Sequence, residues 1–211
     1  MNRLANSSLL LVGACFFGLC LLSILTLTND GFALTRSIGY PFEGRLENGI
    51  PFPREFRGYQ LRSVEHTYTT PELIGALLDA IEGVRRDFPD TCDLYLGDFS
   101  KPGGGPWYPV HKSHQNGRDV DIGMYAKGNV PINGFVPMSE ENLDLEKNLS
   151  LVLHLINSHL VERIFVDSSI QRLLYNYALS RGYDKNFLDK VFQVGTGDYD
   201  YTFVRHEPNH R

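Results

Sequence analysis

The hydrophobic residues of the chain form one long apolar run and several shorter segments in which apolar and polar positions recur with a regular period. The long run covers residues 9–27, and Arg3 is the only charged side chain before it. Such a run is typical of an export signal, and about 20 apolar residues suffice to span a bilayer. We therefore expect residues 1–33 to be a signal peptide, cleaved after Ala33, or an N-terminal membrane anchor. Either form places the rest of the chain outside the cytoplasm.

Apolar residues three to four positions apart predict helices in the rest of the chain. Thr70 and Pro71 suit the first positions of a helix, and its apolar stripe ends before Pro89. The same period predicts helices over 143–158 and 168–182 and a short one over 186–194. Residues 39–53 are rich in glycine and proline, so we expect them to form an ordered coil.

Alternation of apolar and polar residues predicts strands over 93–97 and 119–125, and a further strand is expected over 161–167. In the second of these strands, alternation places Asp119 and Asp121 on one face. Strands and helices are unevenly segregated along the chain, which favours an α+β fold with a mainly antiparallel sheet and flanking helices. We expect residues 34–211 to form one domain.

The overall charge narrows the range of partners. The formal net charge is -5, whereas a protein that grips a polyphosphate needs clustered lysine and arginine to displace its counterions. We therefore expect no nucleic-acid partner.

The segment that carries chemistry is 109–123, where His111, His114, Asp119 and Asp121 fall within eleven residues. Zinc binds neutral imidazole nitrogen and carboxylate oxygen, and a catalytic zinc keeps one position open. His114 and Asp121 are candidate ligands, because Gly117 between them lets the backbone turn back. The alternative is a hydrogen-bonded surface pair without a metal. A third ligand would have to come from elsewhere in the chain.

The spacing His114-x-x-Gly117-x-x-x-Asp121, preceded by Ser113, resembles the zinc motif shared by penicillin-insensitive murein endopeptidases, D-alanyl-D-alanine dipeptidases and lysostaphin-type peptidases. A longer string is similar to the murein endopeptidase branch in particular, over 44–49, 97–104 and 111–122. The resemblance extends over about 39–211. It implies a hedgehog or D-Ala-D-Ala peptidase-like fold and a zinc metalloendopeptidase of the periplasm that cuts D-alanyl–meso-diaminopimelate cross-links in peptidoglycan. A D-alanyl-D-alanine carboxypeptidase or dipeptidase, or an inactive peptidoglycan-binding module, remains an alternative.

The resemblance also implies roles for individual residues. His114 and Asp121 would bind zinc, with His111 close by. The family's third ligand is the last histidine of a closing His-x-x-His-x-His pattern, and His210 fits only the first of these. We therefore expect the zinc peptidase domain to be incomplete at Arg211. The alternatives are an inactive relative of the family, or recruitment of His206 or His210 as the third ligand. His111 and His210 are the candidates for catalytic proton transfer.

The remaining candidates lie around the two expected ligands. Asp119 is expected either to orient a ligand imidazole or to pair with Arg118 or another cation. Arg118 is expected to meet a substrate carboxylate or to stay solvated, and Ser113 is a further candidate for a supporting or substrate contact. Asp98 and Ser100 are expected to fix the loop before the glycines by local hydrogen bonds.

Overall fold

A computed structural model of the chain describes residues 33–194 and 203–206, with the side chains of Arg205 and His206 excepted. The chain divides into two units, Met1–Leu34 and Thr35–Arg211, and the second contains nearly all of the described residues. Over the described ranges, no helix is both long and apolar enough to cross a membrane. Residues 1–32 of the predicted export segment, including the apolar run 9–27, lie outside the described residues.

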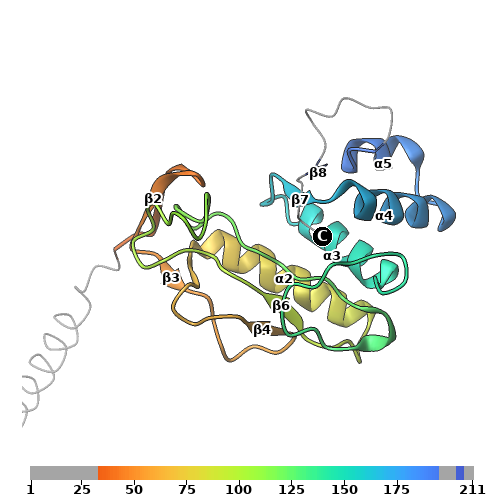
Figure 1. The fold of residues 1–211 in the computed structure, drawn as a ribbon, viewed down its shortest axis with the longest axis horizontal. Coiled ribbons are helices and arrows are strands. Elements are labelled where there is room, and N and C mark those ends of the chain that lie inside the picture. Colours follow the sequence, from red (N-terminus) through yellow and green to blue (C-terminus); the bar gives the residue numbers. More distant parts are fainter. Residues whose placement is uncertain (1–32, 195–202, 207–211) are drawn as a thin grey trace, which may run out of the picture. The chain divides into compact units, whose positions relative to one another are not determined.

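The second unit contains four α-helices and one 3-10 helix among the described residues (Figure 1). The helices are α2 (Pro71–Asp87), η1 (Lys127–Asn129), α3 (Leu145–Asn157), α4 (Ser168–Ser180) and α5 (Lys185–Val191). The four α-helices agree with the predicted ones to within a few residues. Side-chain caps explain where they begin: the Thr70 side chain accepts from the backbone N–H of Leu73, and Asp144, Asp167 and Asp184 cap the other three.

The strands form four two-stranded sheets in the described part of the chain. Two are antiparallel, β1 (Arg36–Tyr40) with β2 (Glu43–Glu47) and β3 (Ile50–Pro51) with β5 (Tyr68–Thr69). Two are parallel, β4 (Tyr59–Leu61) with β6 (Leu94–Leu96) and β7 (Ile164–Val166) with β8 (Val204–His206). The α+β class is therefore confirmed, but the expected mainly antiparallel sheet is replaced by small sheets of both kinds.

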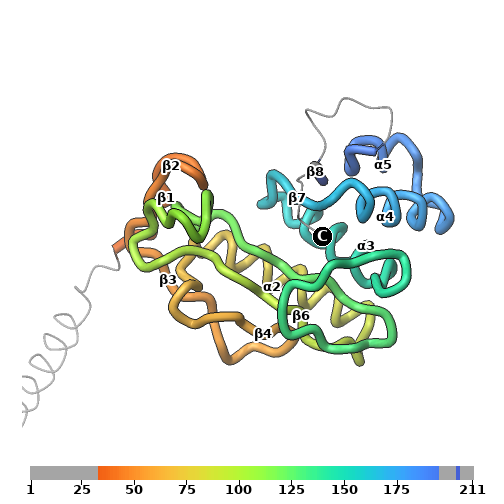
Figure 2. The backbone as a smooth tube through the Cα atoms, in the orientation of Figure 1, coloured from red at the N-terminus to blue at the C-terminus, as the bar shows by residue number. Residues whose placement is uncertain are grey.

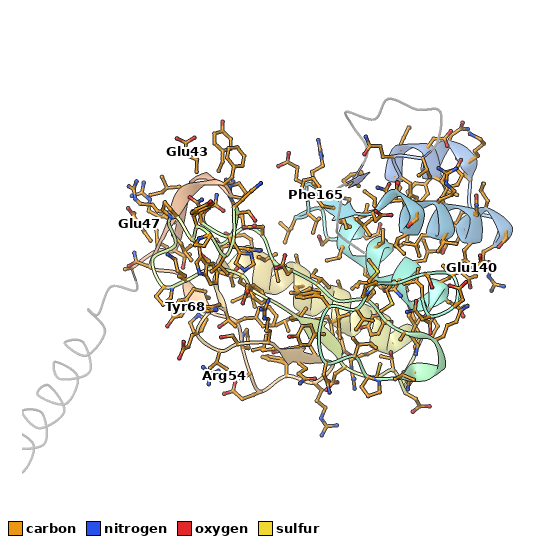
Figure 3. The ribbon with its side chains drawn as sticks, viewed as in Figure 1. Glu43, Glu47, Arg54, Tyr68, Glu140 and Phe165 are labelled. Carbon is orange, nitrogen blue, oxygen red and sulfur yellow. The ribbon has the colours of Figure 1, made fainter. Side chains whose placement is uncertain are left out.

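The glycine- and proline-rich segment 39–53 was wrongly predicted as coil, because it contributes to a hairpin and to β3. Gly39 has a φ of +73°, and Pro41 lies in the two-residue turn between β1 and β2. An exposed two-stranded hairpin tolerates such residues, since each strand has a ladder on one side only. Figure 3 shows Glu43 at the tip of this hairpin.

Two hydrophobic clusters form the core, and α3 contributes to both. Leu149, Val152 and Ile156 face a cluster built with α4 and α5, whereas Leu151 and Leu155 face a cluster built with α2 and β6. This arrangement agrees with Figure 1, where α3 lies between α2 and α4. Because α3 is shared, both clusters are parts of one folded unit.

A long irregular stretch connects β6 to α3, with η1 as its only helix or strand (Figure 2, green). The strand expected over 119–125 lies in this stretch and was wrongly predicted. Residues 121–123 run beside β6 in extended form, with a bridge between Leu96 and Ile122 and backbone bonds from Gly97 to Asp121 and from Gly123 to Tyr95. The irregular stretch holds His111, His114 and Asp121, the three residues that could bind a metal together.

Candidate metal centre

The glycine loop before the site packs directly against the segment that follows it. Gly104 has a φ of +67°, and a Cβ atom there would lie 2.1 Å from the carbonyl oxygen of Gln115. Gly105 donates its N–H to the same oxygen over 2.8 Å. The loop therefore fixes the backbone immediately after His114, at a distance that only glycine allows.

The backbone of His114 is held from several sides. It has a φ of +63°, which is uncommon for a residue with a Cβ atom. Its carbonyl accepts the hydroxyl of Ser100 over 2.7 Å, and its N–H donates to Asp119 Oδ2 over 3.0 Å. Gly117 then reverses the chain with a φ of +72°, and its carbonyl accepts the hydroxyl of Thr69 over 2.8 Å. These bonds maintain a conformation that would otherwise be strained.

The His114 ring lies between two carboxylates. Its Nδ1 is 3.1 Å from Asp119 Oδ2 and its Nε2 is 3.3 Å from Asp121 Oδ1. The side chain of His114 is 4% exposed, whereas Asp119 and Asp121 are partly exposed. The two acids thus face one ring, in keeping with the alternation of the sequence, although the segment is not a regular strand.

These neighbours change the proton affinity of His114 in the metal-free protein. Burial by itself lowers the pKa, but the hydrogen bonds and negative charges of Asp119 and Asp121 outweigh it and raise the pKa of His114 to about 10. At neutral pH the ring is therefore an imidazolium facing two carboxylates, and this trio carries a net charge of minus one. A divalent cation that displaced the proton would be electrostatically favoured.

The metal-free protein is expected to lose stability as the pH rises from about 6.5 to about 10. Below pH 6.5, His114 is protonated in both folded and unfolded states, so its ion pairs contribute fully; this contribution is lost as the pH rises through the folded pKa. Urea unfolding with chelator at about pH 6, 8 and 10 would measure a loss on the order of a few kcal/mol. His114→Gln should lack this component, and equal pH slopes for the two proteins would contradict the prediction.

His111, in the turn before His114, lies next to the His114 ring. Its ring lies edge-on to the His114 ring, with centroids 4.6 Å apart, and its Nε2 lies 2.9 Å from Asp98 Oδ2. Trp107 packs against His111 at 4.8 Å between centroids. The structure therefore places His111 within the cluster rather than at its edge.

His111, His114 and Asp121 form a group that can bind a metal, since one donor atom from each lies within 4.8 Å of the others. Two donors bound to a tetrahedral zinc at about 2.0–2.2 Å are about 3.3–3.5 Å apart. The 3.3 Å between His114 Nε2 and Asp121 Oδ1 has this value. Asp119 at the other nitrogen of His114 supplies the carboxylate that commonly backs a metal-bound imidazole. The donor set and its surroundings thus fit a zinc ion.

The other predicted residues are distributed around this cluster or lie outside the described part. Arg118 is exposed and donates from Nη2 to the carbonyl of Gly39 over 2.6 Å, so it braces the hairpin. Ser113 is half-buried in the turn before His114. His206 ends β8, but its side chain is not among the described ones, and His210 lies outside the described residues.

Three residues of the site were missed or underestimated from the sequence. Asp98, expected only to fix the loop, is 4% exposed and contacts His111. Arg62 Nη1 lies 3.3 Å from Asp98 Oδ2, and His66 Nδ1 lies 3.5 Å from Asp98 Oδ1. A signal existed only for Asp98, an acid directly after the predicted strand 93–97, because Arg62 and His66 lie far from the motif in sequence.

The structure thus defines an α+β protein with a histidine and carboxylate cluster able to bind a metal. Comparison with protein families shows that residues 37–206 match penicillin-insensitive murein endopeptidase. The chain therefore belongs to the penicillin-insensitive murein endopeptidase family, which confirms the resemblance inferred from the sequence. Comparison with curated protein sequences gave no significant match.

Proposed function

We propose that the protein is a zinc-dependent endopeptidase that hydrolyses D-alanyl–meso-diaminopimelate cross-links of peptidoglycan. Membership of a murein endopeptidase family supports peptide hydrolysis in the cell wall. The observation that carries the metal dependence is the His114 ring between Asp119 and Asp121, with His111 against it. We further propose that the protein acts in the periplasm, on the evidence of the apolar run 9–27 and the nature of the substrate.

In this proposal, each residue of the cluster has a separate task. Zinc supplies Lewis acidity, which acidifies water and polarises the peptide carbonyl. His114 would hold the metal through Nε2 and Asp121 through Oδ1, while Asp119 would keep the proton on His114 Nδ1 and so leave Nε2 free for the metal. Because His114 must lose the proton that it holds in the metal-free protein, zinc binding should release a proton and strengthen as the pH rises.

His111 supplies the third protein donor in this arrangement. Its place beside His114 and Asp121 favours a ligand role over the proton transfer predicted from the sequence. The site then has two imidazoles and one carboxylate, a set found in catalytic zinc sites with one open position. Proton transfer is left to another group, and His210 stays a prediction for it.

Cross-linked muropeptide dimers are the substrate that tests this function. The full chain with added zinc is expected to convert dimers to monomers, and a chelator should stop the reaction until zinc is restored. Release of free alanine would instead indicate a carboxypeptidase or dipeptidase. Binding of the dimers without turnover, at any zinc concentration, would indicate a binding module and would contradict the proposal.

A further inference from the structure

Asp98 lies two residues after β6 and contacts His111 of the group that can bind a metal. Its side chain is 4% exposed, and it touches three basic groups, the Nε2 atom of His111, the guanidinium of Arg62 and the Nδ1 atom of His66. The shortest of these contacts, at 2.9 Å, is the one to His111. Neither of the other two partners belongs to the group that can bind a metal.

The chemistry of this contact determines which nitrogen of His111 can bind a metal. An ionised carboxylate only accepts hydrogen bonds, so Nε2 must carry the proton that it donates to Asp98. In neutral imidazole the lone pair is then on Nδ1. We propose that Asp98 is a positioning residue, which holds His111 as the Nε2-protonated tautomer and leaves Nδ1 as its metal donor. This inference rests on the proposed zinc site and deepens it.

Asp98 also acts on a second donor through its backbone. Its carbonyl accepts the N–H of Asp121 over 3.0 Å, and the neighbouring Gly97 donates to the carbonyl of Asp121 over 2.8 Å. One residue therefore sets the ring of His111 and the backbone of Asp121. Asp119 has a similar relation to His114. Its carboxylate lies 3.1 Å from the ring nitrogen Nδ1 and also accepts the backbone N–H of His114.

An ion pair with Arg62 alone would not account for this arrangement. The Arg62 side chain is 49% exposed and its contact with Asp98 measures 3.3 Å, so this contact is longer and better screened by solvent than the one to His111. By contrast, the His111 side chain is 17% exposed and its ring also packs against Trp107. Asp98 and Trp107 together restrict the plane of the ring, which is what a metal ligand requires.

The tautomer can be measured without any metal. Long-range proton–nitrogen NMR of the metal-free full chain, at a pH where His111 is neutral, is expected to show its proton on Nε2 and none on Nδ1. The Nδ1-protonated tautomer would overturn the proposal. This measurement stands even if the wild-type protein fails to bind zinc, an outcome that would contradict the proposed function instead.

The affinity for zinc tests whether positioning of His111 by Asp98 matters for metal binding. Asp98→Asn is expected to weaken zinc binding, measured by competition with a chromophoric chelator, by about 10- to 100-fold. The matched control is Asp87→Asn, because Asp87 Oδ2 also lies 2.9 Å from a histidine Nε2, that of His154, outside the cluster. It should leave the affinity unchanged. An unchanged affinity in Asp98→Asn would overturn the proposal.

A combined variant separates positioning from general support of the fold. In a His111→Phe background, Asp98→Asn should have little further effect on zinc affinity, because the residue through which it acts is gone. A merely structural role would give the same loss in both backgrounds, and that result would also overturn the proposal. Should Asp98→Asn fail to fold, the tautomer of the unmodified protein still decides the question.

Discussion

Replacement of His114 by alanine is expected to abolish both metal binding and peptide hydrolysis. The imidazole is the centre of the cluster, since its two nitrogens face Asp119 and Asp121 at 3.1 and 3.3 Å. Without it, Asp119 and Asp121 lose the cation between them and the metal loses a donor. Loss of the Lewis acid removes several kcal/mol of transition-state stabilisation, so hydrolysis should fall by more than about a thousandfold.

The measurement is the metal content of the dialysed protein together with turnover of cross-linked muropeptides. His154→Gln is the matched control: His154 also pairs with an aspartate, at 2.9 Å, but on α3 next to α2. It should retain stoichiometric metal and wild-type turnover. Stoichiometric zinc in His114→Ala would show that the cluster is not the metal site, whereas loss of zinc with full turnover would show that hydrolysis does not need it.

The helices could be predicted from sequence because their signals are local. In α2, the cap Thr70, the early Pro71 and the apolar stripe all occur within one segment of chain and agree with one another. The same holds for the part of the site between His111 and Asp121. Its candidate metal ligands and the glycine that lets the chain turn all lie within eleven residues. Such features depend little on what the rest of the chain does.

The features that could not be predicted depend on contacts between distant segments. Residues 119–125 alternate like a strand, yet only residues 121–123 bond to β6 and the residues just after it, so no regular strand forms. Arg62 and His66 meet Asp98 from 36 and 32 residues away, and no pattern in the sequence marks them. The third donor was expected beyond Arg211, and this stays a prediction; among the described residues, His111 lies close enough to His114 and Asp121 to share a metal with them.

Gly104→Ala is expected to destabilise the protein by about 3 kcal/mol and to weaken its metal binding. The added Cβ atom would lie 2.1 Å from the carbonyl oxygen of Gln115 and 2.7 Å from the backbone nitrogen of Leu46. Both contacts are with backbone, which cannot rotate away as a side chain can. The segment that must move is the one that holds His114, so stability and affinity for zinc should fall together.

The neighbouring Gly103 separates this steric effect from backbone strain. Gly103 and Gly104 have φ values of +77° and +67°, but a Cβ atom at Gly103 meets no heavy atom within 4 Å. Gly103→Ala should therefore show only the cost of the left-handed conformation, about 1 kcal/mol, and an unchanged zinc affinity. The free energy of unfolding in urea and a zinc titration would be measured for both variants. Equal losses would mean that the glycine loop is only a flexible connection, whereas a larger loss at Gly104, with weaker zinc binding, would show that close packing of the loop on Gln115 builds the metal site.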